Sequence, residues 1–118
     1  MRDRRSLGRS GEEEAVAFLK RKKFKILGRG FRFHRGEIDI VAQDKETLVF
    51  VEVKTRRKPD FGRPEESVTP SKQNQIRKLA AAYMAINNLH HAPCRFDILS
   101  LLGDDQEGYE ILHITDAF

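Results

Sequence analysis

Apolar residues first recur at helical spacing near the start of the chain. Over residues 7–22, Ala15 and Leu19 belong to a stripe that returns once per helical turn. Ser6 and Ser10 stand before and within this stretch, and serine is a common N-cap residue. The pattern therefore predicts a first helix over residues 7–22, with Ser6 or Ser10 as its cap.

A second helical pattern occupies the second half of the chain. Thr69 and Pro70 form the pair typical of an N-cap and a first helical position, and apolar residues from Ile76 to Ile86 then follow at helical spacing. Asn87 and its neighbour interrupt the spacing. We therefore expect a long second helix that ends there.

The remaining regular segments show the patterns of β-strands. Gly28 and Gly30 interrupt the first of them, which predicts an outer strand with a bulge or a bend. Residues 56–68 contain proline and glycine without an apolar period, which predicts a mobile loop. The strands are expected at residues 24–33, 37–43, 47–55, 95–102 and 110–115.

The order of these elements, α-β-β-β-α-β-β, indicates an α/β fold. A length of 118 residues fits one domain, so we expect residues 1–118 to share a single core. The content of 39% hydrophobic and 34% charged residues is typical of a folded globular protein.

The predicted hairpin of residues 37–55 carries charges at positions where burial is expected. Strand side chains alternate in direction, so Glu52 and Lys54 share a face with Leu48 and Phe50. The same alternation divides the preceding strand into two sets, Glu37, Asp39 and Val41 on one face and Ile38, Ile40 and Ala42 on the other. Acidic groups at such positions need a compensating partner.

A shared cation would compensate Asp39 and Glu52. Two carboxylates about 4 Å apart repel each other by roughly 4 kcal/mol at an effective dielectric constant near 20, and a magnesium ion between them turns this repulsion into attraction. The alternative is that Glu52 and Lys54 form a surface ion pair worth less than about 1 kcal/mol, with Asp39 hydrogen-bonded near the turn.

The hairpin also resembles known sequences. Residues 36–40 (GEIDI) and, thirteen positions from Asp39 to Glu52, residues 50–54 (FVEVK) are similar to the D...ExK signature of restriction enzymes and Holliday-junction resolvases. More closely, the chain resembles the uncharacterised YraN family along nearly its whole length. The further matching stretches are residues 8–12 with Ala15, residues 61–64, Lys72, residues 95–97 and residues 113–118.

This resemblance implies a restriction-endonuclease-like core, in which a central mixed β-sheet is flanked by helices, and a metal-dependent nuclease. Asp39, Glu52 and Lys54 would be catalytic, and one Mg²⁺ or Mn²⁺ ion would be the cofactor for hydrolysis of nucleic-acid phosphodiester bonds. No base-reading helix is evident, so we expect selection of a structure or an end. The alternatives are a non-catalytic nucleic-acid-binding module on the same fold and a purely structural or protein-interaction domain.

Two residues outside the hairpin are further candidates. Glu12 aligns with the apolar stripe of the first helix, whereas Glu13 and Glu14 turn away from it. The resemblance implies that Glu12 completes the metal shell, and the alternative is a charge that stabilises the helix dipole. Lys72 either reaches the site or a phosphate, or extends into solvent.

The charge of the chain suits a polyanionic partner. The net charge is +4, and basic residues are grouped, notably at Arg56, Arg57 and Lys58, which we expect to hold a nucleic-acid backbone together with Lys72. We expect DNA more than RNA. Basic groups of this kind also occur on faces that only contact solvent. Resolvase-like relatives pair as dimers, so the resemblance allows a homodimer.

The sequence also bears on the cellular compartment. It contains no apolar run long enough to cross a bilayer, and its first residues lack the apolar region of a signal peptide, so we expect no membrane association. The lone Cys94 cannot form an internal disulfide and is expected to be a small buried residue. These features favour the cytoplasm.

Overall fold

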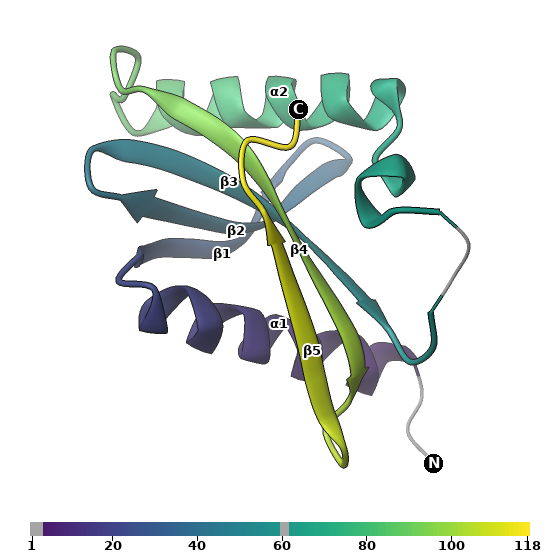
Figure 1. Cartoon of the computed structure of the whole chain (residues 1–118). Helices are drawn as coiled ribbons and strands as arrows, with labels where there is room; N and C mark the ends of the chain where they lie inside the picture. The colour runs from purple at the N-terminus through teal and green to yellow at the C-terminus, as the bar shows by residue number, and fades with distance from the viewer. Residues whose placement is uncertain (1–3, 60–61) are drawn as a thin grey trace.

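The computed structural model describes residues 4–59 and 62–118, and of residues 4–9 the backbone alone. Five strands form one sheet in the order β1-β2-β3-β4-β5, in which only β3 and β4 run parallel. Helix α1 lies on one face of the sheet and α2 on the other (Figure 1). The elements are α1 (Arg4–Arg21), β1 (Lys25–Phe33), β2 (Gly36–Asp44), β3 (Thr47–Arg56), η1 (Pro64–Ser67), α2 (Pro70–Ile86), β4 (Cys94–Asp104) and β5 (Gly108–Ile114).

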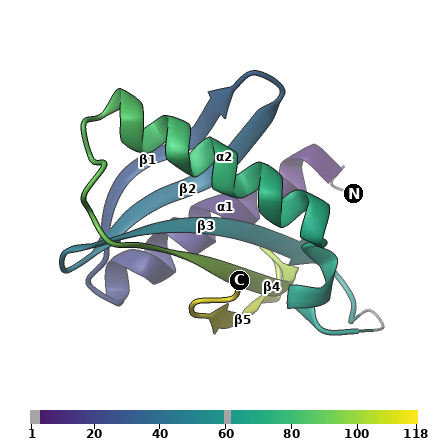
Figure 2. The ribbon, with the colours of Figure 1, turned by 90° about the horizontal axis from the view of Figure 1, so that it is seen from above.

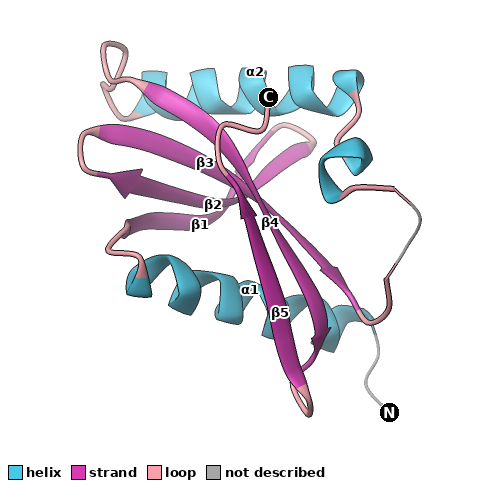
Figure 3. Cartoon of the chain, in the orientation of Figure 1, coloured by secondary structure: helices cyan, strands magenta, loops and turns pink. Residues whose placement is uncertain are grey.

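The predicted α/β class, element order and mixed sheet are confirmed (Figure 3). β1 is an edge strand and has the expected irregularity, a register shift between Ile26 and Gly28. The segment predicted as a loop over residues 56–68 differs in two respects. β3 continues through Arg56, because it pairs with β4 as far as Leu102, and residues 64–67 form a short 3-10 helix.

The predicted start of α2 is confirmed, whereas the predicted start of α1 is not. The side chain of Thr69 accepts a hydrogen bond from the Lys72 amide at 3.3 Å, and Pro70 is the first residue of α2, as predicted. The prediction for α1 was wrong, because this helix already begins at Arg4 and both Ser6 and Ser10 therefore lie inside it. Serine is compatible with a helix interior, so its presence did not locate the end.

Each face of the sheet carries its own apolar cluster. The alternation of β3 is confirmed, since Val49 and Val51 pack toward α1 whereas Leu48 and Phe50 pack toward α2. Seen from above, α2 crosses the middle strands of the sheet (Figure 2). Glu52 and Lys54 continue the α2-facing series, which brings them under the start of that helix.

The alternation of β2 breaks in the middle of the strand. Ile38 and Val41 belong to the cluster under α2, whereas Ile40 and Ala42 belong to the cluster under α1. The prediction that Val41 shares a face with Asp39 was therefore wrong, as was the grouping of Ile38 with Ile40. The break falls at Asp39, where the pairing of β2 with β3 ends.

Strands β2 and β3 pair only over the part of the hairpin next to its turn. Paired positions run from the turn at Asp44 and Thr47 to Ile40 and Val51, and no further pair follows. Beyond that point β3 keeps its partner β4, and β2 keeps its partner β1. The two strands thus diverge, and Asp39 and Glu52 are the first residues of the open end.

Helix α1 approaches the open end of the hairpin through a glycine. A Cβ atom added at Gly11 would collide with the Thr55 side chain of β3. We predict that Gly11→Ala lowers the free energy of unfolding by about 1–2 kcal/mol, because overpacking outweighs the gain of about 1 kcal/mol in helix propensity. Urea unfolding measures this change.

Two variants control this prediction. Thr55→Ala removes the two nearest atoms and should restore part of the lost stability in the double variant. Gly28→Ala, where an added Cβ would have no neighbour within 4 Å, should be nearly neutral. Equal losses in Gly11→Ala and Gly28→Ala would contradict the close contact.

An ionic network stands apart from the open end of the hairpin. The side chain of Asp97 is fully buried, and its two oxygens accept hydrogen bonds from Arg95 Nε at 3.0 Å, from the Asp116 amide at 3.0 Å and from His113 Nε2 at 2.7 Å. Arg95 also binds Asp44 at 3.1 Å. Asp97 and Arg95 therefore form a salt bridge.

Two further expectations can be compared with the structure. Cys94 is exposed, because it begins β4 next to the turn that precedes the strand, so its predicted burial was wrong. In the part of the chain that the structure describes, neither α1 nor α2 is long and apolar enough to cross a membrane.

Candidate functional site

A polar pocket lies at the open end of the hairpin, on the side of α1. It has a volume of about 340 Å³ and is lined by Glu12 of α1, Glu37 and Asp39 of β2, and Val53 and Thr55 of β3. The Val53 amide donates a hydrogen bond to Asp39 Oδ2 at 2.8 Å. Divergence of the strands leaves this amide without a β2 partner, and the carboxylate takes that place.

The electrostatics of this pocket act most strongly on Asp39. Burial, and next the negative charge of Glu52, raise the pKa of Asp39 from 3.8 to about 7. The hydrogen bond from Val53 opposes the shift, and Glu12 and Glu37 add to it. The surroundings of Asp39 therefore disfavour its ionised form near neutral pH.

The other two acids of the pocket have cationic neighbours. Glu12 Oε1 lies 3.3 Å from Arg29 Nε, and Glu37 Oε2 lies 3.3 Å from Arg32 Nη2. Glu12 points toward the pocket whereas Glu13 and Glu14 are exposed, as the helical spacing predicted. In the described part of the chain, Asp39 takes part in no ion pair.

A second cluster lies on the α2 side of β3. The buried carboxylate of Glu52 forms an ion pair with Lys72, with a distance of 3.3 Å between Oε2 and Nζ. Lys72 thus reaches the site, and the alternative that it only extends into solvent was wrong. The Coulomb effect of Glu52 raises the pKa of Lys72 in spite of the opposing effect of burial.

Lys54 adjoins this pair. Burial first, and the neighbouring amino group of Lys72 next, lower the pKa of Lys54, whereas Glu52 and Asp39 oppose the shift. The two lysines of the cluster therefore differ: one is held as a cation by its carboxylate and the other releases its proton more readily.

The predicted residues thus form two groups that meet at β3. Glu12 and Asp39 share the pocket on the α1 side, while Glu52, Lys54 and Lys72 gather on the α2 side. Among the acids that act on Asp39, Glu52 has the largest effect. The structure therefore couples Asp39 and Glu52 electrostatically, although their side chains do not line one common pocket.

The donors of this site suit a hard divalent cation. Among the described residues, no three histidine, cysteine, aspartate or glutamate side chains come together closely enough to hold a metal ion. Mg²⁺, however, needs only one or two carboxylates, because it keeps several water ligands. Asp39 and Glu52 would meet this need, and the uncompensated charge around Asp39 is what a cation would neutralise.

The remaining basic candidates follow the open end of β3. Arg56 is half-buried at the last position of the strand, and Arg57 and Lys58 are exposed just beyond it. Residue 61, which belongs to one of the matching stretches of the sequence, lies outside the described residues, as does residue 60. The structure therefore places three cations along the continuation of the strand that carries Glu52 and Lys54.

One pocket residue was not assigned a role from the sequence. Glu37 was placed on the face of Asp39 by strand alternation, yet it received no function. Its position two residues before Asp39 was the available signal.

Comparisons with known proteins agree with the resemblance found in the sequence. Residues 11–101 match the model of the uncharacterised protein family UPF0102. A UPF0102 protein of Geotalea uraniireducens is 51% identical over 116 residues, which cover 98% of this chain and 91% of that protein. A UPF0102 protein of Pelobacter propionicus is 46% identical over 118 residues, covering 98% and 84% of the two chains.

The comparison with solved structures is weaker. The structure of Pyrococcus furiosus SfsA in complex with Ca²⁺ is 15% identical, with a TM-score of 0.35. It matches over 96% of this chain and 64% of that one, so this chain spans less than two thirds of its length.

Proposed function

The chain belongs to the uncharacterised protein family UPF0102 (YraN), and on the chemistry of its own site we propose that it is a metal-dependent nuclease. The observation that carries this proposal is the half-buried carboxylate of Asp39, coupled to Glu52 beside two lysines. An acid whose ionised form is disfavoured is costly to a fold, and groups with such perturbed pKa values cluster at functional sites.

Asp39 and Glu52 would hold one Mg²⁺ or Mn²⁺ ion, and Glu12 would support it from α1, directly or through water. When bound, the ion would lower the pKa of a coordinated water and neutralise charge on a phosphate oxygen. The Val53 amide keeps Asp39 Oδ2 in place, which leaves the other carboxylate oxygen for the cation. Glu52 is oriented from the opposite side by Lys72.

The lysines act on the phosphate. Lys54 lies on the same face of β3 as Glu52, so its amino group can orient the attacking water and offset charge that develops on the phosphorus oxygens. Lys72 stays cationic and can bind an adjacent phosphate. The water oxygen forms a bond to phosphorus as the bond to the 3′-oxygen breaks, which leaves a 5′-phosphate and a 3′-hydroxyl.

The nucleic-acid backbone would continue along the basic end of β3. Arg56, Arg57 and Lys58 extend from the strand that carries Lys54, so phosphates next to the scissile one can lie over them. Contacts of this kind carry no base sequence, and we propose selection of a structure or an end, with DNA preferred over RNA.

Cleavage assays test the proposal. Flap, junction, single-stranded and linear duplex substrates of DNA and RNA are incubated with the protein and Mg²⁺ or Mn²⁺, with chelator in parallel. We predict that Glu52→Gln and Lys54→Met each lower the rate about a hundredfold, because each removes a charge that stabilises the transition state.

Matched variants separate the site from general effects of charge. Glu46→Gln and Lys20→Met make the same changes at exposed positions, and both should cleave at the rate of the original protein. Cleavage that survives Glu52→Gln would show that the activity does not come from this site. Salt-sensitive binding without cleavage at any metal concentration would favour the non-catalytic module.

A further inference from the structure

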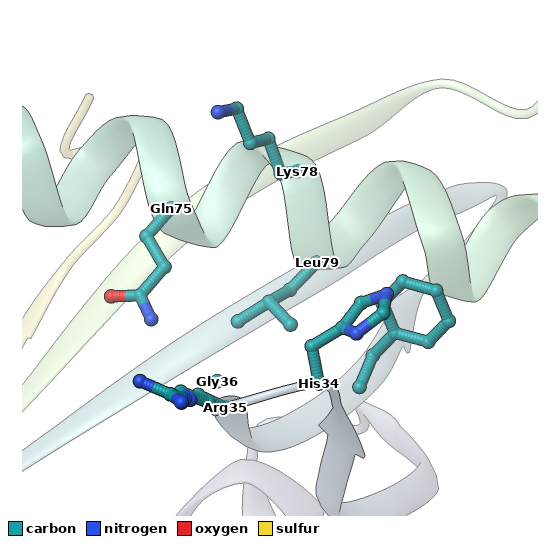
Figure 4. A pocket seen from close by; sticks show the side chains of 7 residues that line it. His34, Arg35, Gly36, Gln75, Lys78 and Leu79 are labelled. Carbon is teal, nitrogen blue, oxygen red and sulfur yellow. The ribbon is translucent and has the colours of Figure 1, made fainter.

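A second pocket lies on the α2 side of the sheet, where the β1–β2 turn meets the helix. It has a volume of about 500 Å³ and is of the size that binds small molecules. Its lining combines an aromatic pair, a small floor and polar or basic groups (Figure 4). The residues are Phe33, His34, Arg35, Gly36, Gln75, Lys78 and Leu79.

The floor of this pocket depends on a close approach between Gly36 and α2. A Cβ atom at Gly36 would lie 2.7 Å from Leu79 Cδ1 and 3.1 Å from Gln75 Nε2. Only a residue without a side chain lets the helix lie this low over the turn. The result is an apolar floor with the Gln75 amide beside it (Figure 4).

The aromatic wall of the pocket consists of Phe33 and His34, and it is exposed. Phe33 is 41% exposed, and its ring meets that of His34 edge to face, with the centroids 4.4 Å apart. Two residues earlier, Phe31 packs against Tyr83 of α2 at a centroid distance of 5.2 Å, which fixes the strand to the helix. Phe33 therefore presents an aromatic surface on a strand that packs against α2.

The charge of the pocket selects the class of ligand. Arg35 is exposed at the turn below Gln75, and Lys78 contributes its stem from α2 while its amino group points away (Figure 4). None of the seven lining residues is acidic. An aromatic surface, an amide that can donate and accept, and a guanidinium group together suit a nucleobase with its phosphate.

The position of the pocket ties it to the lysine cluster. Lys72 and Gln75 are three residues apart on α2, and Leu79 lies about 10 Å beyond Lys72 along the helix axis. At the duplex rise of about 3.4 Å per nucleotide, this distance corresponds to roughly three stacked nucleotides, and to fewer in an extended single strand. A single strand could therefore pass from the cluster to the pocket.

We propose that this pocket binds the base of an unpaired nucleotide, one to three positions from the phosphate held at Lys54 and Lys72. The substrate would then be a nucleic acid with a single-stranded stretch, such as a flap or an overhang. This inference rests on the proposed function for the position of the phosphate. The base stacks on Phe33, Gln75 contacts its edge, and Arg35 binds the backbone.

Binding without turnover tests the pocket. Fluorescence anisotropy measures the affinity of the whole chain, in chelator, for a labelled single-stranded DNA oligomer and for the same oligomer made of abasic sites. Phe33→Ala should weaken binding of the normal oligomer about tenfold and leave the abasic one unchanged, since base stacking alone is lost. Arg35→Ala should weaken both and reduce the dependence on salt.

Controls distinguish the possible failures. Leu112→Ala removes another exposed apolar side chain, on β5, and should change neither affinity, and thermal unfolding verifies that each variant is folded. Equal affinity of Phe33→Ala and the original protein for the normal oligomer would overturn the pocket and leave the nuclease proposal standing. A change of oligomeric state in Phe33→Ala, measured as the molecular mass of the particle in solution, without a change in affinity would show that the pocket is an interface between copies of the chain. That result would overturn its role in binding a nucleotide. Absence of cleavage by the original protein, with Phe33-dependent binding intact, would overturn the nuclease alone.

Discussion

Asp39→Asn is expected to stabilise the metal-free protein by about 2–4 kcal/mol at pH 8, because each pKa unit corresponds to about 1.4 kcal/mol. The pKa of Asp39 rises from 3.8 to about 7 on folding, owing first to burial and then to Glu52. An asparagine carries no charge, and its side-chain oxygen can still accept the hydrogen bond from Val53. The substitution therefore removes the cost of a partly buried charge and keeps the local hydrogen bond.

The dependence on pH gives this prediction its sign. Below about pH 3.8, Asp39 is protonated in both the folded and the unfolded state, so the variant gains nothing. As the pH rises toward 7, the unfolded chain ionises freely whereas the folded chain resists, and the stability of the original protein falls relative to the variant. Above pH 7 the difference is complete and constant.

Urea unfolding in chelator at pH 4, 6 and 8 measures the difference. Glu46→Gln, an equivalent change at an exposed position, should show no such trend. Addition of Mn²⁺ should raise the melting temperature of the original protein and not that of Asp39→Asn, since a ligand stabilises only the state that binds it. An Asp39→Asn protein that is less stable at pH 8 would contradict the electrostatics of the site.

Asp97→Asn is expected to have an effect of similar size in the opposite direction, a loss of about 3–5 kcal/mol. The carboxylate is fully buried and accepts from Arg95, His113 and the Asp116 amide. The Lys22 ammonium donates to His113 Nδ1 at 2.9 Å, so the ring must donate through Nε2 to Asp97. The amide NH₂ of an asparagine would face one of the groups that donate to Asp97, so two donors would meet. The guanidinium group of Arg95 would also lose the buried negative charge that it pairs with.

The matched control is Asp44→Asn. Asp44 binds the same guanidinium group at 3.1 Å, but its side chain is 32% exposed, so the change should cost less than about 1 kcal/mol. Urea unfolding at pH 7 compares the two variants. Equal losses would show that burial is not what makes the Asp97 network strong.

Acid titration checks the same network independently. Burial favours the neutral form of Asp97, but hydrogen bonds from His113, Arg95 and Asp116 outweigh it, and its pKa is lowered below 3.8. The stability that these bonds contribute is fully present above pH 3.8 and is lost as the pH falls through the folded pKa. Asp97→Asn should lack this acid-dependent loss.

The local features of the fold could be predicted from the sequence, because they depend on neighbouring residues. Thr69 with Pro70 marked the start of α2, and the run from Leu48 to Lys54 gave the two faces of β3 correctly. The break at Asp39 could not be predicted. It arises where β2 leaves β3, and nothing in the alternation of residues 37–43 encodes where a strand parts from its neighbour.

Much of the candidate site depended on longer-range packing. The sequence supplied Asp39, Glu52 and Lys54, but the division of the site into two sides of β3 follows from the placement of both helices. Lys72 reaches Glu52 only because α2 crosses above the end of β3. The second pocket was missed for the same reason, since its wall and its floor come from segments about forty residues apart.

Through its hydrogen bond with the Val53 amide, the Asp39 carboxylate connects β2 to β3 in addition to being a candidate metal ligand. A strand amide that would normally be satisfied by main chain relies here on one side-chain atom. Shortening or lengthening that side chain would change the angle of the fork together with the direction of the acid. The separation of β2 from β3 and the orientation of the Asp39 carboxylate are therefore linked through this hydrogen bond.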